Sequence, residues 1–201
     1  MLKNSFRIVL SAVLFVSGLT AAAFAQTAET PKDFSSVRIK NFGEMDANFY
    51  RGAQPKKDDY ASLATLGIKT VVDLRDDPEN YEQSAAEAAG LKYVNIPMSD
   101  TEYPKPESID AFLKLIGDPA TGAIFVHCAG GRHRTGIIGA VYRFNKYGWN
   151  YEQVYAEMKR YDFYTRWGHG AMKDFVIDYA AKMTTVPVVV SEAQNTAGEN
   201  R

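Results

Sequence analysis

The sequence of residues 123–136 reads AIFVHCAGGRHRTG. Its first four residues are apolar and indicate a short buried strand, while the residues from Thr135 to Tyr147 have the pattern of a helix that Gly148 ends. A glycine-containing loop therefore joins a strand to a helix. Ligands in α/β folds bind at the carboxyl ends of the strands, so this loop is the first candidate for a binding site.

The loop has the residue types that bind an oxyanion such as phosphate. Its glycines let the backbone fold tightly and turn successive N–H groups inward, and the positive end of the following helix points to the same place. The planar fork of Arg134 suits two oxygens of a phosphoryl group. Arg132 and His133 either add positive charge at the rim or are simply solvated. Residues expected to surround the bound group are Ala129, Gly130, Gly131, Arg132 and His133.

Cys128 is the one cysteine of the sequence. A thiol close to a helix N-terminus and to cationic groups has a pKa lowered from ~8.5 to between about 3.5 and 7.5, so Cys128 is expected to be ionised near neutral pH and to act as a nucleophile. A lone buried cysteine that serves only as a small apolar side chain is the alternative. Thr135 is placed to donate its hydroxyl to the sulfur. His127 is expected to support the loop by hydrogen bonding.

Strand and helix patterns alternate along the chain. Strands are expected at residues 37–42, 48–51, 68–74, 91–98 and 123–126. Helices are expected at residues 56–66, 76–90, 106–116, 135–147, from about 150, and 171–183. This alternation predicts an α/β fold of one domain, with a central, mostly parallel sheet flanked by helices and the Cys-x5-Arg loop between a strand and a helix.

The N-terminal residues have the order of a secretory signal peptide. Lys3 and Arg7 precede the apolar run from Ile8 to Leu19, and small residues end in Ala23-Phe24-Ala25. We expect cleavage after Ala25 and a periplasmic or secreted protein, with an uncleaved anchor as the alternative. The expected divisions are a signal peptide at 1–25, a flexible segment at 26–36, the domain at 37–183 and a disordered tail at 184–201.

Composition limits the classes of partner. The chain is 46% hydrophobic and 23% charged, which is ordinary for a globular domain, and its formal net charge of −1 argues against binding of nucleic acid or of an anionic membrane surface. One cysteine allows no internal disulfide. The three histidines, His127, His133 and His169, do not form a metal-ligand pattern, so neither a metal nor another cofactor is expected.

The loop resembles that of a known family. Residues 127–135 fit the His-Cys-x-x-Gly-x-x-Arg-Thr signature of cysteine-based protein tyrosine and dual-specificity phosphatases. The GRHRTG stretch that starts at Gly131 is similar to the Gly-Lys-His-Arg-Thr-Gly of compact atypical dual-specificity phosphatases of plants and fungi. Phe49-Tyr50-Arg51-Gly52 and Pro55 also look like that group. The resemblance runs from Asn48 to Tyr147 and extends toward Met183.

The resemblance implies hydrolysis of phosphate esters through a phosphocysteine intermediate. In this family an aspartate, on a loop after the strand that precedes the cysteine segment, protonates the leaving group. The matching stretch is PMSDTE, residues 97–102, so Asp100 is the expected acid and Glu102 the alternative. Asp100 could instead only cap a turn. Asp73, which follows another strand, is expected to be structural.

The resemblance leaves the substrate open. Phosphorylated tyrosine, serine and threonine of proteins are the main expectation, and inositol polyphosphates or pyrophosphates are the alternative. A phosphate-binding module without activity is the alternative from another class. Two further thiol enzymes fit less well, because arsenate reductases rely on additional cysteines and rhodanese-type sulfurtransferases have a loop of different length.

Overall fold

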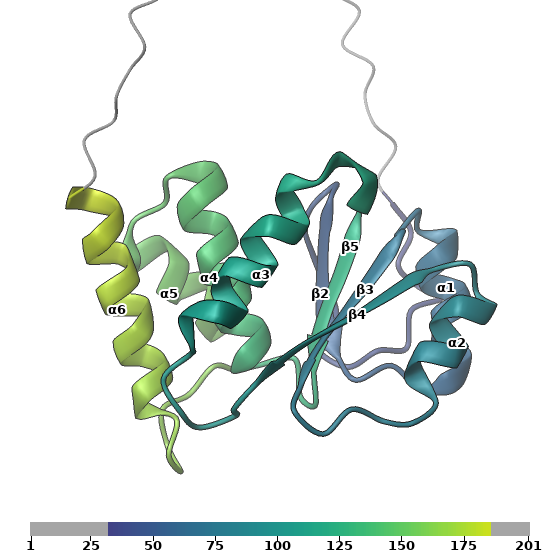
Figure 1. The fold of residues 1–201 in the computed structure, drawn as a ribbon, viewed down its shortest axis with the longest axis horizontal. Coiled ribbons are helices and arrows are strands. Elements are labelled where there is room, and N and C mark those ends of the chain that lie inside the picture. Colours follow the sequence, from purple (N-terminus) through teal and green to yellow (C-terminus); the bar gives the residue numbers. More distant parts are fainter. Residues whose placement is uncertain (1–31, 186–201) are drawn as a thin grey trace, which may run out of the picture. The chain divides into compact units, whose positions relative to one another are not determined.

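The computed structural model describes residues 32–185, and its middle layer is a sheet of five strands (Figure 1). The strands are β1 (Gly43–Asp46), β2 (Phe49–Ala53), β3 (Thr70–Arg75), β4 (Lys92–Met98) and β5 (Ile124–Cys128). They lie side by side in the order β1-β2-β5-β3-β4, and only the β1–β2 pair is antiparallel. The expected α/β class with a mostly parallel sheet is confirmed, and β5 is its central strand.

The pleat of the strands sends alternate side chains into two separate cores. Val72 and Val126 face one core, while their neighbours Val71 and Phe125 face the other. Figure 1 shows that helices cover both faces, with α1 and α2 on the side opposite to the other labelled helices. The first face is covered by α3 (Pro106–Gly117), α4 (Arg134–Tyr147), α5 (Tyr151–Arg160) and α6 (Gly170–Thr185). The second is covered by α1 (Tyr60–Thr65) and α2 (Glu82–Ala88), with the short helices η1 (Lys57–Asp59) and η2 (Pro119–Thr121) in connections.

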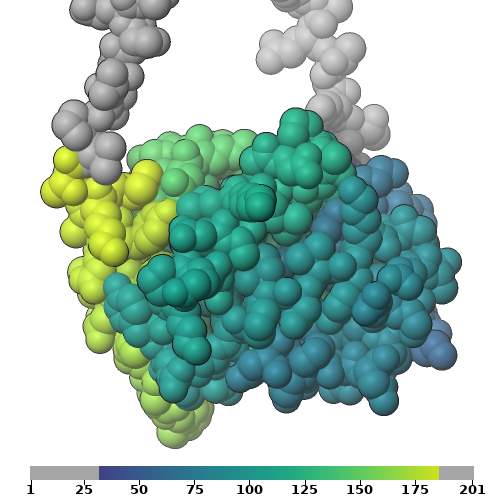
Figure 2. All heavy atoms as spheres, viewed as in Figure 1, coloured from purple at the N-terminus to yellow at the C-terminus, as the bar shows by residue number. Residues whose placement is uncertain are grey.

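The chain between β4 and α3 closes against α6. Tyr103 packs edge-on against Phe175, with ring centroids 5.4 Å apart, and its hydroxyl donates to Asp178. In the space-filling view the atoms of this segment lie directly beside those of α6 (Figure 2). The loop that carries Asp100 is therefore attached at its far end to the last helix.

The prediction of a strand at residues 37–42 is wrong. Asn41 has a φ of 55°, which bends the chain out of the extended conformation, and the ladder starts only at Gly43. Residues 43–46 pair with β2 across a two-residue turn, in which the Asp46 carboxylate accepts a hydrogen bond from the N–H of Asn48. Such an Asx-type turn, rather than β-branched residues, produces this hairpin.

The helix expected from residue 76 starts later, at Glu82. Asp76 and Asp77 lie in a loop because arginines bind their carboxylates, Arg134 for the first and Arg75 for the second. The other helices agree with expectation to within a few residues. Asn150 caps α5 as expected, since it exchanges two hydrogen bonds with Gln153.

The expected signal peptide, part of the expected flexible segment and nearly all of the expected tail lie outside the described residues. Phe34, in the expected flexible segment, packs against Phe42 and Tyr50, and α6 continues to Thr185. From Phe34 onward the described chain forms one unit. Within residues 32–185, no helix combines the length and the apolar character needed to cross a bilayer.

Candidate active site around Cys128

The loop between β5 and α4 requires glycine at one position. Gly131 has a φ of 65°, and a Cβ there would lie 2.4 Å from the backbone carbon of Gly52. Gly130 has room, because the nearest atom to an added Cβ is in the side chain of Arg132, at 3.6 Å. The tight approach of the loop to β2 therefore depends on Gly131.

Cys128 is 4% exposed at the end of β5. Burial, the largest influence, acts to raise the pKa of its thiol. The hydroxyl and the N–H of Thr135 act in the opposite direction, as do the charge of Arg134 and the N–H of Arg132, and the resulting pKa lies below the ordinary value. The Thr135 hydroxyl is buried and has no hydrogen-bond partner within the described residues, so it is available to the thiolate.

Arg134 begins α4, and its side chain reaches back across the end of the sheet. Nη1 donates to the Asp76 carboxylate at 2.7 Å and to the carbonyl of Met98 at 3.2 Å. Nη2 and Nε have no protein acceptor among residues 32–185. Because two contacts fix the guanidinium while these donors remain available, the fork can bind oxygens of a phosphoryl group.

Cys128 lies at a pocket of about 200 Å³. Its lining consists of Asp100, Cys128, Ala129, Gly130, Arg132, His133, Arg134, Tyr164 and His169. A larger hollow of about 510 Å³, between α3 and α4 at the opposite end of β5, has neither a cysteine nor an arginine in its lining. The smaller pocket is the one that can support chemistry, because it joins a thiol to an anion-binding loop.

The two candidates for the acid that protonates the leaving group line different hollows in the structure. Asp100 lines the Cys128 pocket, whereas Glu102 lines a neighbouring hollow with Asp76. The backbone carbonyl of Asp100 accepts a hydrogen bond from Nδ1 of His169 at 2.8 Å, which ties the acid loop to the segment before α6. This geometry favours Asp100 over Glu102.

His133 does not supply the positive charge considered above. Its ring stacks on His169 at 3.6 Å, meets Tyr164 edge-on, and contacts the carbonyl of Tyr164 through Nε2. Burial and the charge of His169 lower the pKa of His133 to about 4, so it is neutral at physiological pH. These three rings form an aromatic wall of the pocket. Only the aromatic content of residues 161–169 could have indicated this wall from the sequence.

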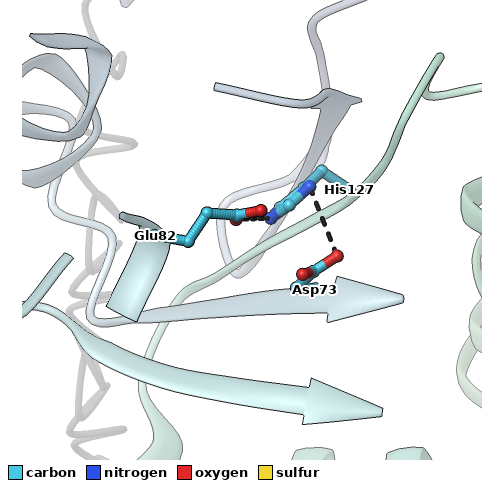
Figure 3. Close-up of side chains that lie close together, drawn as sticks. All are labelled: Asp73, Glu82 and His127. Carbon is cyan, nitrogen blue, oxygen red and sulfur yellow. Dashed lines mark ion pairs between the residues drawn. The ribbon is translucent and has the colours of Figure 1, made fainter. Parts of the chain in front are cut away.

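His127 points away from the pocket, into the core under α1 and α2. Its Nε2 lies 3.1 Å from a carboxylate oxygen of Glu82, and its Nδ1 lies 3.8 Å from Asp73 (Figure 3). Neither contact has good hydrogen-bond geometry. Hydroxyls of Tyr60 and Tyr93 donate to the two carboxylates. The direct hydrogen bonds to the loop come instead from Asn41, Arg51 and Gln54, of which only Arg51 lay in a segment that the sequence singled out.

This buried triad has the residue types of a metal site, but its arrangement suits an ion-pair network better. The imidazole lies between the acids and faces each with a different nitrogen, as Figure 3 shows. One atom of each side chain lies within 4.8 Å of the others, but the contacts at 3.1 and 3.8 Å are made by different ring nitrogens, as in an imidazole held between two acids. Burial raises the pKa of Asp73. Burial also acts to raise the pKa of Glu82, but contacts with His127, Gln54 and Tyr60 together bring it below its ordinary value. Glu82 is thus the ionised partner of the imidazole.

A family model described as "DSP-PTPase phosphatase fused to NAD+ Kinase" matches residues 21–174. The chain belongs to this family of phosphatases. It is a cysteine-based phosphatase, a hydrolase, as the loop signature implied. The family assignment covers β1 through the first turn of α6, including every residue of the pocket.

Curated relatives are similar over much of the chain. The dual specificity protein phosphatase TpbA of Pseudomonas aeruginosa (strain UCBPP-PA14) is 28% identical over 159 residues, which are 77% of this chain and 71% of that protein. The inositol diphosphatase SIW14 of Saccharomyces cerevisiae is 26% identical over 133 residues, 62% of this phosphatase and 46% of the yeast protein.

Solved structures share the fold. The crystal structure of P. aeruginosa TpbA has a TM-score of 0.59 at 24% identity, and covers 69% of this phosphatase and 84% of that chain. The catalytic domain of S. cerevisiae SIW14 has a TM-score of 0.60 at 20% identity, with 74% and 96% covered. At these identities the likeness is one of fold.

Proposed function

We propose that this phosphatase hydrolyses phosphotyrosine in proteins, with phosphoserine and phosphothreonine as further substrates. The observation that carries the proposal is the pocket itself, in which an activated thiol lies beside the aromatic wall of His133, Tyr164 and His169. A flat ring of a phosphotyrosine can pack against such a wall while its phosphoryl group enters the amide loop. The similarity to a dual specificity protein phosphatase supports the same class.

The proposed reaction has two steps. The Cys128 thiolate attacks phosphorus, the bond from phosphorus to the ester oxygen breaks, and Asp100 gives its proton to the departing oxygen. Water then attacks the phosphocysteine, Asp100 takes the proton from the water, and the sulfur leaves as a thiolate. The Thr135 hydroxyl stabilises that thiolate, and Arg134 holds two phosphoryl oxygens throughout. Protein groups supply every charge in this scheme, so no metal is required.

Inositol polyphosphates are the second candidate class. Relatives named inositol diphosphatases in yeast and rice support it, as does Arg132 at the rim of the pocket. Against it, the pocket holds two arginines beside Asp100, and its neutral His133 adds no charge. A ligand with many phosphates would leave most of its charge without a cationic partner.

One assay separates the two classes. The values of kcat/KM for phosphotyrosyl peptides and for phytate-like substrates are measured in the wild type and in Arg132→Ala. If phosphotyrosine is the substrate class, kcat/KM for the peptides should exceed that for the inositol substrates tenfold or more, which is about 1.4 kcal/mol of transition-state binding. Arg132→Ala should leave this preference unchanged. A preference for the inositol substrate that Arg132→Ala removes would establish the second class instead.

We also propose that the protein is exported. The charged, apolar and small-residue order of residues 3–25 supports this, with a mature chain that begins at Gln26. N-terminal sequencing of protein purified from the periplasm or medium tests it. A soluble form that retains Met1 would contradict the cleavage.

A further inference from the structure

The outer side of the phosphate loop is held by donors from the chain around β2. The N–H of Gln54 donates to the carbonyl of Ala129, at 3.3 Å. The Asn41 amide donates to the carbonyl of Gly131 at 2.9 Å, with a longer contact of 3.4 Å to Gly130. A peptide group points its C=O and N–H in opposite directions, so outward carbonyls turn the following N–H groups into the loop.

One peptide group connects these donors to the sulfur. Arg51 Nη2 donates to the carbonyl of Gly131 at 2.8 Å, and Asn41 donates to the same oxygen. The N–H of that peptide group belongs to Arg132 and is among the groups that lower the pKa of Cys128. The guanidinium therefore binds the carbonyl end of an amide whose N–H end stabilises the thiolate, and a hydrogen bond at one end of an amide polarises the other end.

Arg51 is also a buried cation without an acidic partner. Its side chain is 1% exposed, lies under α4 on the same face of the sheet as Cys128, and has its guanidinium 3.9 Å from the ring centre of Tyr161. In the described residues, the ion pairs of arginine are those of Arg75, Arg134 and Arg143, and Arg51 has none.

An unpaired buried charge is costly unless another charge compensates it. Burial lowers the pKa of Arg51 to about 10, which leaves it protonated at neutral pH, and Cys128 and Glu157 are among the groups whose negative charge favours the protonated form. Glu157 is already bound to Arg143, so the thiolate is an anion that remains available to Arg51.

We propose that Arg51 is a positioning residue for Cys128, which aims the Gly131–Arg132 peptide at the sulfur and offsets the negative charge of the thiolate and of the bound phosphoryl group. Asn41 is the second donor to the same carbonyl. This inference deepens the proposed function and rests on it, but the state of the thiol can be measured without any turnover.

The test measures alkylation of Cys128 by iodoacetamide as a function of pH. The sequence has one cysteine, so the rate reports this thiol alone, and inorganic phosphate is titrated as a protecting ligand. Arg51→Met should move the midpoint of the alkylation profile upward by about one pH unit, a roughly tenfold change in ionisation, and should weaken phosphate protection by a similar factor. Arg51→Lys keeps the charge but not the fork, so its midpoint should move less while phosphate protection still weakens.

Arg143→Met is the matched control. Arg143 is another buried arginine under the same helices, but it binds Glu157 and the carbonyl of Met45 and does not touch the loop. It should lose stability in urea without a shift of the alkylation midpoint. If Arg51→Met does not fold, Arg51→Lys and Asn41→Gly provide the same two measurements, because glycine tolerates the φ of 55° at that position.

Unchanged midpoints and phosphate protection in folded Arg51 variants would overturn the proposal. The same result as in Arg143→Met, a loss of stability alone, would likewise reduce Arg51 to a structural residue. A shifted midpoint in an enzyme that hydrolyses no phosphotyrosyl peptide would support the positioning role and remove the proposed substrate, so the two failures can be told apart.

Discussion

His127 and Cys128 are neighbours in the chain, but they face two regions of opposite charge. On the α1–α2 side, His127 lies between two buried carboxylates, Asp73 and Glu82. On the α4 side, Cys128 has Arg134 and Arg51 near it, and Arg51 forms no ion pair with a carboxylate of the described residues. The alternation of one strand thus keeps the acidic network on the opposite side of the sheet from the thiolate.

The two regions also differ in access. The side chains of Asp73, Glu82 and His127 are 0% exposed, whereas Cys128 opens on a pocket. An ionised carboxylate such as Glu82, added to Asp76 and Asp100 on the thiolate side, would raise the pKa of the thiol and repel phosphate. We interpret the acidic region as an anchor that joins β3, β5 and α2, and the cationic region as the place of the chemistry.

The largest expected effect is on the cationic side, in Cys128→Ser. The alcohol cannot ionise near neutral pH while the amide loop remains, so turnover should fall to background with phosphate binding largely retained. Release of phosphate from phosphotyrosyl peptides and calorimetric binding of phosphate measure the two quantities. More than a few per cent of residual activity would make a phosphocysteine intermediate untenable.

Asp100→Asn should have the next largest effect. An acid that protonates the leaving group contributes roughly 10² to 10⁴ in rate, so poor leaving groups should lose that factor and activated aryl phosphates should lose less. The alkaline limb of the pH–rate profile should flatten. Glu102→Gln, in the adjacent hollow, is the matched control and should change little. Equal and small losses for all leaving groups would return Asp100 to a structural role.

The close contact between the phosphate loop and β2 can be broken by adding one atom, a Cβ at Gly131. Gly131→Ala brings a Cβ onto the backbone of Gly52 and should reduce kcat/KM by about 10², the scale of a displacement of ~1 Å in a catalytic group. Gly130→Ala has space and should stay within a few-fold of the wild type. The test compares kcat/KM of the two variants, measured with para-nitrophenyl phosphate. Equal damage in both would mean that the glycines serve flexibility rather than contact.

Substitutions on the acidic side should change the stability of the protein more than its catalytic rate. Glu82→Gln removes the ionised partner of His127 and should lower the free energy of unfolding by about 1–3 kcal/mol at pH 7, with kcat within a few-fold. The folded-state pKa of Glu82 is lowered, so its contribution is present above the unfolded value of ~4.3 and is lost as pH falls below it. The difference between wild type and variant in urea unfolding should therefore shrink below about pH 4.

Glu87→Gln, on the exposed side of the same helix, is the control for that change and should be nearly silent. A large loss of kcat in Glu82→Gln at unchanged stability would show that the acidic network acts on the chemistry directly.

Local patterns predicted the region from β5 to α4 well. The apolar run, the glycine loop and the helix are encoded within 25 residues, and the capping box of α5 is equally local. What failed does not appear as a hydrophobic period. The β1 hairpin depends on the turn at Asp46 and on pairing with β2, and the chain before α2 is held by arginine contacts with Asp76 and Asp77, of which the one from Arg134 is distant in sequence.

The site was predictable to a similar degree. Residues of the loop itself could be named from their spacing, whereas the neutral state of His133 follows from contacts with Tyr164 and His169 that no local pattern encodes. Arg51 lay within a segment noted as a short strand and for its resemblance, without a role of its own. Its hydrogen bond to the carbonyl of Gly131 forms only when β2 and β5 pair.

That pairing also sets when the enzyme becomes reactive during folding. Arg51 and Gly131 are 80 residues apart, and contacts of such separation form only after the intervening chain has closed on itself. With the role proposed for Arg51, the cysteine segment lacks its outer support until β2 joins β5, and its thiol should until then have a pKa nearer the ordinary value. A newly made chain should therefore reach its full nucleophilicity only when its central sheet is complete.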